Sequence, residues 1–360
     1  MYMLTGSGMK KLWVLLVALG ATLAVTSTAH AASYKGAFLV ADQSGKAPNT
    51  DPNLINPWGI SFSATGDFWV SDNNAGVSTL YNTTGVPQSL VVTIPSATGV
   101  GAGTPTGTVF NSTTGFTITQ NGKSGPALFL FDSEDGVITG WNPSVNPTVA
   151  VVAVNNSSSG AVYKAMELAN NGTANFLYVC NFFSAKVEVY DQNFKPATLS
   201  GSFTDPYLPT GFAPHNIRNI NGQLYVAYAK QNATKTDAVL GKGLGLVNVF
   251  DLNGNFVKRF AMKGTLNAPW GLALATANFG TFSNDILVGN LGDGTINAFD
   301  PSTGAFLGQL NTSTGGVLKI PGLWGLMFGN GGQGGLKDTL YFTSGPSAYA
   351  HGRFGSVTAQ

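Results

Sequence analysis

Short apolar runs separated by turn-forming residues follow one another along the chain after residue 32. Six of these runs mix aliphatic and aromatic residues: Phe68-Trp69-Val70, Leu128-Phe129-Leu130, Leu177-Tyr178-Val179, Leu224-Tyr225-Val226, Ile286-Leu287-Val288 and Leu340-Tyr341-Phe342. Residues of this kind favour strands, and pairs such as Asn221-Gly222 and Asn253-Gly254 are typical of β-hairpin turns. No long helical period competes with them. The pattern therefore predicts an all-β protein.

A recurring opening precedes these runs. It is clearest in Asn56-Pro57-Trp58-Gly59-Ile60, Ala213-Pro214-His215-Asn216-Ile217, Ala268-Pro269-Trp270-Gly271-Leu272 and Leu323-Trp324-Gly325-Leu326. Repeats starting at Pro57, Pro105, Val162, Pro214, Pro269 and Pro321 lie 48 to 57 residues apart. This spacing is slightly longer than the period of about 40 to 50 residues of propeller blades, and loop insertions account for the excess. We expect four strands in each repeat, and hence a six-bladed β-propeller. A pair of β-sandwiches is the alternative fold, but it does not explain six repeats.

Two incomplete pieces at the ends of the repeat region complement each other. A lone strand, Gly36 to Val40, precedes the first repeat, and the last repeat ends after Phe354 to Val357 without a fourth strand. Pairing the N-terminal strand with the last blade would close the ring and cover two open sheet edges. We therefore predict that residues 32–360 form one propeller domain closed by its N-terminal strand.

Residues 1–31 have the features of a signal peptide. Lys10 and Lys11 precede the apolar run Leu12 to Leu19, and Ala29-His30-Ala31 matches a signal peptidase site, so we expect cleavage after Ala31. Met9 is an alternative start. We expect an exported protein, periplasmic or extracellular, whose mature chain has no membrane span, since no second long apolar segment follows.

Charge and cysteine content narrow the class of function. Lys and Arg number 18 against 17 Asp and Glu, and no basic run follows residue 31, so nucleic acid is not an expected partner. Cys180 is the only cysteine, which excludes an intramolecular disulfide, and it lies in an apolar run where we expect a buried, inert thiol.

The mature chain resembles a family of uncharacterised secreted bacterial β-propellers related to the NHL-repeat proteins. The segments that carry the resemblance are 38–43, 53–60, 68–73, 268–272 and 351–356. It implies a six-bladed propeller of the NHL type. Members of this family have no assigned activity, so the resemblance implies no catalytic residue.

One column of the repeat suggests a metal site. Aligning the second runs brings together Asp72, Asp132, Asn181, Tyr228, Asn290 and Ser344. Oxygens of Asp72, Asn181 and Asn290 converging on the axis could bind calcium, which takes six to eight hard oxygen ligands. The competing interpretation is that Asp and Asn end strands because they form turns.

His215 is the candidate catalytic residue. It occupies the repeat position of Trp58 and Trp270, where it would act as a general base in the channel or simply fill an aromatic slot. Trp58, Trp270 and Trp324, with Tyr228, are the candidate aromatic platform for a sugar or apolar ligand. Packing between blades is the alternative role.

Two classes of function remain open. The first is a binding or scaffold module for a protein or glycan partner, because no complete catalytic set is present. The second is a calcium-assisted hydrolase or lyase with its site in the central channel. Whether the protein is an enzyme is left undecided, and so is any cofactor beyond calcium. An envelope structural component is a third, weaker hypothesis.

Overall fold

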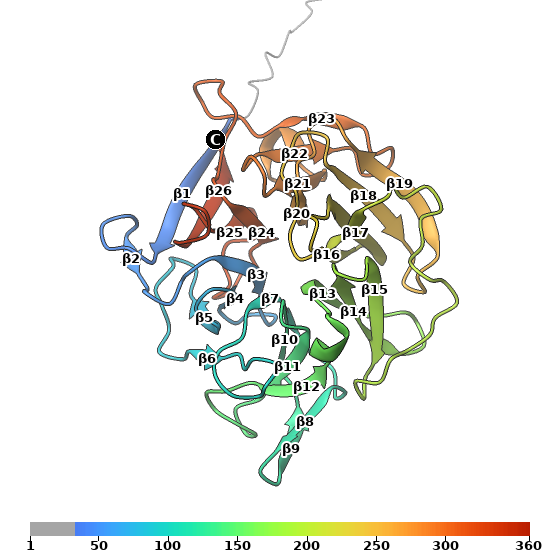
Figure 1. The fold of residues 1–360 in the computed structure, drawn as a ribbon. Coiled ribbons are helices and arrows are strands. Elements are labelled where there is room, and N and C mark those ends of the chain that lie inside the picture. The colour runs from blue at the N-terminus through green and yellow to red at the C-terminus, as the bar shows by residue number, and fades with distance from the viewer. Residues whose placement is uncertain (1–32) are drawn as a thin grey trace, which may run out of the picture. The chain divides into compact units, whose positions relative to one another are not determined.

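The computed structural model describes residues 33–360, so the predicted signal peptide lies outside the described residues. Six antiparallel sheets follow one another around a central axis (Figure 1). In each sheet the first strand lies nearest the axis, and it contacts the first strand of the next blade. The first strand of the last blade contacts that of the first, so the ring is closed.

The first three blades span residues 57–191. Blade 1 consists of β3 (Pro57–Ser61), β4 (Phe68–Asp72), β5 (Val77–Tyr81) and β6 (Val92–Thr93). Blade 2 consists of β7 (Pro105–Phe110), β10 (Phe129–Ser133), β11 (Val137–Trp141) and β12 (Val151–Asn155), and it carries the extra hairpin β8 (Thr117–Gln120) and β9 (Lys123–Pro126). The short helix η1 (Ser157–Ser159) leads to blade 3, which consists of β13 (Tyr163–Asn170), β14 (Asn175–Asn181) and β15 (Lys186–Asp191).

The other three blades complete the ring. Blade 4 consists of β16 (Phe212–Ile220), β17 (Gln223–Lys230), β18 (Gly245–Phe250) and β19 (Phe256–Met262). Blade 5 consists of β20 (Pro269–Leu274), β21 (Ile286–Asn290), β22 (Ile296–Phe299) and β23 (Phe306–Gln309), with the short helix η2 (Gly280–Phe282) after its first strand. Blade 6 consists of β24 (Leu323–Phe328), β25 (Leu340–Ser344), β26 (Arg353–Ala359), β1 (Tyr34–Ala41) and β2 (Asn49–Thr50).

The repeat pattern of the sequence agrees with these elements. The six inner strands begin within two residues of the predicted repeat starts. Asn221 and Gly222 form a two-residue turn between β16 and β17 with φ of 52° and 79°, the left-handed conformation that this turn type requires. The prediction of an all-β, six-bladed propeller is confirmed.

The N-terminal strand closes the ring as expected. β1 pairs with β26 in antiparallel register from Tyr34 opposite Ala359 to Ala41 opposite Arg353. Polar contacts reinforce the end of this seam, since Asp42 accepts a hydrogen bond from Arg353 at 2.7 Å and lies 2.7 Å from the ring of His351. His351 therefore has a structural role at the closure of blade 6.

Blade 3 departs from the expected four strands. Only three strands are present, and residues 192–203 touch β15 through a single bridge from Tyr190 to Pro196. Blade 1 has the same bridge to a proline, from Tyr81 to Pro87, and still forms the fourth strand β6, so Pro196 alone does not end the pairing. The expectation of a fourth strand in every repeat is therefore wrong for this blade.

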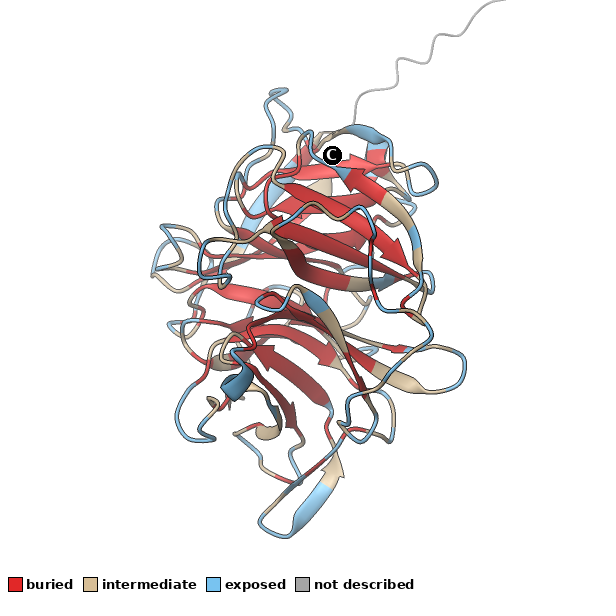
Figure 2. Cartoon of the chain, turned by 45° about the vertical axis from the view of Figure 1, so that its right-hand side comes forward, coloured by how far each residue is buried: buried red, intermediate tan, exposed pale blue. Residues whose placement is uncertain are grey.

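The core lies between neighbouring blades. Figure 2 shows buried residues along the strands and exposed residues in the loops and on the β8–β9 hairpin at the bottom of the view. Cys180 is fully buried in the core between blades 3 and 4, and burial raises the pKa of its thiol well above the ordinary value, as expected of an inert thiol. Among residues 33–360, no helix is long and apolar enough to cross a membrane.

Candidate functional site

A ring of six side chains surrounds the axis near the start of the inner strands. Each comes directly after the first inner-strand residue that pairs with the end of the second strand: Trp58, Thr106, Lys164, His215, Trp270 and Trp324. The pairing of every inner strand with its neighbour is interrupted at this residue. Irregularities of this kind re-aim a side chain and are common next to functional sites. The same register shift therefore places tryptophan at the axis in three blades and threonine, lysine or histidine in the other three.

The glycine after each of three ring tryptophans permits close packing around the axis. A Cβ atom on Gly59 would lie 2.6 Å from the carbonyl oxygen of Thr106, and one on Gly325 would lie 2.6 Å from that of Trp58. Neither distance is compatible with a larger residue. The Trp-Gly repeat thus serves packing between blades as well as the presentation of tryptophan.

The three predicted tryptophans come together at the ring. Trp58 and Trp324 stack with ring centroids 3.5 Å apart, and Trp270 meets both edge-on at 6.2 and 5.9 Å. The indole N–H of Trp324 donates to Asn56, and that of Trp270 donates to the carbonyl of Lys164. All three are nearly buried, so they form a floor rather than an exposed platform.

A buried amine lies beside this floor. Lys164 is 1% exposed and pairs with Glu134, and its Nζ also lies 3.4 Å from an oxygen of Asp237. The same Nζ lies 5.1 Å from the centroid of Trp58, within the range of a cation–π contact. Exposure rises outward, from 23% for the Glu134 side chain to 67% for that of Asp237. The three charged groups therefore extend from the buried floor, at Lys164, to the solvent-exposed carboxylate of Asp237.

His215 is held as a neutral ring with one nitrogen unpaired. Its Nδ1 lies 3.0 Å from the carbonyl oxygen of Pro269, and because a carbonyl can only accept, Nδ1 carries the proton. Burial lowers the pKa of His215 to about 3, and the nearby Lys164 adds to this shift. The imidazole is therefore neutral at ordinary pH but is a weaker base than a free histidine.

These groups surround one cavity, which we call the first mouth. Its volume is about 480 Å³. Its lining consists of Asn56, Trp58, Asn73, Asn74, Glu134, Lys164, His215, Asp237, Ala238, Leu240, Leu291, Trp324, Ala348 and Tyr349. Ser347, Ala348 and Tyr349 have φ of 57°, 53° and 68°, a left-handed run that non-glycine residues adopt at a cost. This strained loop holds the ring of Tyr349 5.8 Å from that of Trp324.

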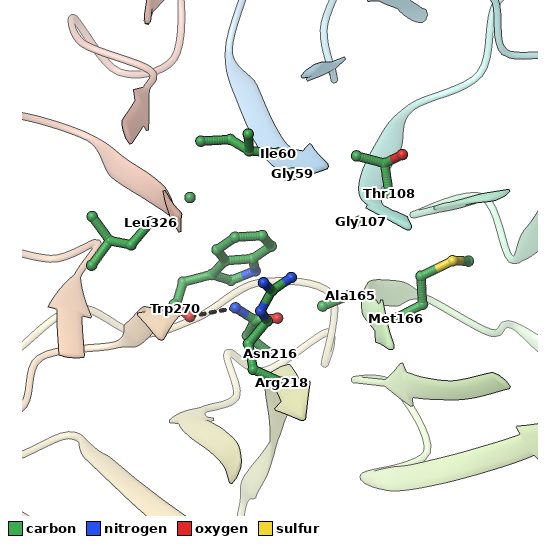
Figure 3. Close-up of a pocket in the computed structure, with 11 residues that line it drawn as sticks. Gly59, Ile60, Gly107, Thr108, Ala165, Met166, Asn216, Arg218, Trp270 and Leu326 are labelled. Carbon is green, nitrogen blue, oxygen red and sulfur yellow. Dashed lines mark hydrogen bonds between the residues drawn. The ribbon is translucent and has the colours of Figure 1, made fainter. Parts of the chain in front are cut away.

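The inner strands continue from the first mouth to a narrow neck. Figure 3 shows this neck, of about 20 Å³, with Arg218 extending into it beside Trp270. At the far ends of the same strands lies another cavity of about 280 Å³, which we call the second mouth. Its lining consists of Phe62, Arg218, Asn219, Ile220, Asn221, Leu272, Ala273, Leu274, Leu326, Met327 and Phe328.

The three residues expected to bind calcium lie in blades 1, 3 and 5, and each forms hydrogen bonds within its own blade. Asp72 is buried and accepts from Thr79 at 2.7 Å. Asn181 caps the local turn by accepting from Ser184, and Asn290 accepts from the backbone of Asn267. None of the three lines the first mouth.

The acid–base state of Asp72 also bears on the calcium hypothesis. Burial raises the pKa of Asp72 well above its ordinary value, whereas a calcium ligand must be a carboxylate. Within residues 33–360, no three His, Cys, Asp or Glu side chains are grouped so that they could hold a metal ion. The calcium site stays a prediction from the sequence.

Tyr228 does not join the aromatic floor. It is buried in the core with Cys180 and Phe250, between blades 3 and 4. Conversely, the sequence reasoning missed Lys164, Glu134 and Asp237. In the structure Lys164 occupies the position of Trp58 and His215, but the predicted repeat start at Val162 had put Tyr163 there. The loop residues Glu134 and Asp237 carry no repeat signal.

The fold and this central site define a six-bladed β-propeller with a cavity at its axis. Two uncharacterised proteins of Acanthamoeba polyphaga mimivirus are similar in sequence. Protein R648 is 34% identical over 299 residues, which cover 82% of this chain and 73% of R648. Protein L690 is 36% identical over 302 residues, which cover 82% of this chain and 79% of L690. The chain therefore belongs to the same family as these uncharacterised proteins. These relatives are viral, whereas the sequence resemblance had suggested a bacterial family. No protein-family model matches the chain.

Solved structures support the architecture. Virginiamycin B lyase from Staphylococcus aureus superposes with a TM-score of 0.52 at 10% identity, covering 91% of this chain and 99% of that one. The soluble aldose sugar dehydrogenase of Escherichia coli gives a TM-score of 0.54 at 11% identity, and the superposition covers 91% of this chain and 100% of the dehydrogenase. At such low identity the likeness establishes the fold alone.

Proposed function

We propose that the protein is a binding module whose first mouth takes a glycan residue. The observation that carries the proposal is the combination, in one cavity, of an aromatic floor and a rim of amides and carboxylates. A sugar has apolar faces that pack on aromatic rings and hydroxyl groups that need donors and acceptors around their edge. The cavity volume of about 480 Å³ lies in the usual range of small-ligand sites.

The charge balance of the first mouth supports a neutral, hydroxyl-bearing ligand. The cation of Lys164 is already matched by Glu134 and Asp237, which leaves no free positive charge in the cavity for an anionic ligand.

The test is a binding screen on the protein comprising residues 32–360. Probes are oligosaccharides of glucose, xylose, mannose and N-acetylglucosamine, followed by tryptophan fluorescence and calorimetry. For any sugar that binds, Asp237→Asn is expected to lower the affinity about tenfold, since hydrogen bonds to charged groups are among the stronger ones. Asp338→Asn, an exposed carboxylate on blade 6, is the control and should leave the affinity unchanged.

Failure of every sugar to bind would count against the glycan proposal and leave a protein partner as the remaining occupant of a binding module. A pull-down with the same domain would then be the next step.

The calcium-assisted hydrolase or lyase is the alternative. The observation that favours an enzyme is the unpaired Nε2 of neutral His215 in the lining of the first mouth. A pKa of about 3 makes that nitrogen a weak base, so the binding module has the stronger support. Elemental analysis of the dialysed protein tests the metal. About one calcium ion per chain would favour the enzyme, and none would argue against this version of it.

Export remains a proposal from the sequence. The Lys10-Lys11 pair, the apolar run and the Ala29-His30-Ala31 motif support cleavage after Ala31 and delivery to the periplasm or the medium, as in the secreted bacterial NHL-related propellers that the sequence resembles. Sequencing the N-terminus of protein recovered outside the cytoplasm tests it. A mature chain that begins at residue 32 is the expected result, and an intact N-terminus is the contrary one.

A further inference from the structure

The second mouth differs from the first in its charge. Among the described residues that line the neck and the second mouth, Arg218 is the only charged one. It lies on β16, three residues after His215, and its side chain is 27% exposed. A single cation thus faces an otherwise uncharged cavity.

The guanidinium of Arg218 is only partly used by the protein. Its Nε lies 3.7 Å from an oxygen of Glu167, a loose ion pair, and that oxygen also accepts a hydrogen bond from the backbone of Asn219 at 3.1 Å. Neither terminal nitrogen of Arg218 has a hydrogen-bond partner within residues 33–360. Figure 3 shows the side chain of Arg218 beside the indole of Trp270, and Arg218 lines both the neck and the second mouth. Two parallel N–H donors are therefore free for a planar anion.

The walls around this cation are mostly apolar. Leu272, Leu326 and Met327 line the second mouth together with the aromatic rings of Phe62 and Phe328. Burial raises the pKa of Glu167, although Arg218 opposes the shift, so the one carboxylate beside Arg218 is easier to neutralise than an exposed one. The site combines a carboxylate-shaped donor pair with a hydrocarbon surface.

We infer that the second mouth binds an amphipathic monocarboxylate, with the carboxylate on Arg218 and an aliphatic chain against the apolar wall. One guanidinium matches one negative charge, and its planar fork fits a carboxylate. A phosphate dianion would need further cations, and no others line this cavity. The site is separate from the first mouth, because the neck of about 20 Å³ has no room for more than a water molecule or two.

The experiment titrates octanoate, below its micellar concentration, into the domain comprising residues 32–360 by calorimetry. We expect one octanoate per chain, and an affinity at least about tenfold lower in Arg218→Leu, since a charge-assisted bidentate pair is lost. Lys123→Met removes one positive charge from the exposed β8–β9 hairpin and should bind octanoate as the wild type does. Equal affinity in Arg218→Leu and wild type, or no binding by wild type, would overturn the inference.

A comparison of ligands tests the same point on the unaltered protein, in case Arg218→Leu does not fold. Octanol keeps the chain and lacks the charge, whereas acetate keeps the charge and lacks the chain. Both should bind at least about tenfold more weakly than octanoate. If octanol bound as tightly as octanoate, the positive charge would have no role and the inference would fail.

Discussion

The two ends of the propeller axis are built on the same six inner strands and differ in chemistry. At the first mouth, aromatic rings and amides surround a cation that two carboxylates already pair with, and of these three charged groups only the carboxylates reach solvent. At the second mouth, aliphatic and aromatic side chains surround one guanidinium that is loosely paired. β16 contributes to both, with His215 at one end and Arg218 toward the other.

The difference shows how a repeat fold becomes asymmetric. At the first mouth four of the six ring residues line the cavity, and the shared position holds tryptophan in blades 1 and 6, lysine in blade 3 and histidine in blade 4. At the second mouth the charge comes from blade 4 alone. A propeller thus acquires two unlike sites without a change in its backbone, which is why fold alone does not indicate function.

The largest effect is expected from breaking the ion pair of the first mouth. Lys164→Met leaves Glu134 and Asp237 without their cation, and we expect a loss of about 3 kcal/mol of unfolding free energy, reduced somewhat by solvent at Asp237. Urea denaturation measures it, with Lys186→Met, an exposed lysine, as the control. A loss below about 0.5 kcal/mol would mean that the buried amine contributes little to the first mouth.

Acid should lower the free energy of unfolding of the protein through His215, which lines the first mouth. Its pKa is about 3 in the folded protein and near 6.5 when unfolded, so above pH 6.5 the ring is neutral in both states. As the pH falls from 6.5 toward 3, the unfolded chain binds a proton that the folded chain does not, and stability is lost. Between pH 7 and pH 5 this loss amounts to about 2 kcal/mol.

The measurement compares urea denaturation of wild type and His215→Gln at both values of pH. The variant lacks this titration, so the difference between the two proteins should shift in favour of the variant by about 2 kcal/mol at the lower pH. Parallel pH profiles would show that His215 titrates normally. The comparison between proteins is needed because buried Asp132 has the opposite pH dependence. Its pKa is raised to about 7, so its effect is to lower the stability of the protein as the pH rises.

The two mouths should differ in how strongly salt weakens ligand binding. Octanoate binding depends on a partly exposed cation and should weaken about threefold between about 0.05 and 0.5 M NaCl, whereas binding of a neutral oligosaccharide should change little. Calorimetry at both salt concentrations measures the two affinities on the same protein. Equal salt sensitivity would contradict the assignment of charged and neutral ligands to different mouths.

The smallest effect is expected for coupling between the mouths. Because the neck is nearly filled by side chains, saturation with octanoate should change the affinity for an oligosaccharide by less than about twofold. A larger change would mean that β16 transmits a rearrangement from Arg218 to His215, and the two mouths would then be parts of one site.

The fold could be predicted because each blade must bury its own alternating apolar face against the next. The runs around Trp69, Tyr178 and Tyr225 therefore repeat with the blades, and the lone strand before Pro57 indicated how the ring closes. The missing strand of blade 3 could not be predicted in the same way. The segment after the third strand begins alike in blades 1 and 3, with a bridge to Pro87 and to Pro196, and only blade 1 goes on to form a fourth strand.

The site was predicted only where it follows the repeat. Trp58, Trp270 and Trp324 come together because they share one position, and the same position contained Lys164. Tyr228 shared a column with Asp72 but packs into the core, since the orientation of a strand side chain depends on local register as well as on spacing. Arg218 carries no repeat signal, because the equivalent position holds a residue of opposite charge, Glu167, in blade 3 and uncharged residues in the other blades.

The seam between β1 and β26 has a consequence for the time course of folding. Asp42 and Arg353, which meet beside it, are 311 residues apart in the chain. At about 5 to 20 residues per second, β1 waits about 15 to 60 s after its own synthesis before its partner strand exists. Until then the ring stays open with two unpaired edges, and such edges are prone to join other chains. The strand pairing that closes the ring is therefore the last one that chain synthesis permits, and the two edges are open to other chains until it forms.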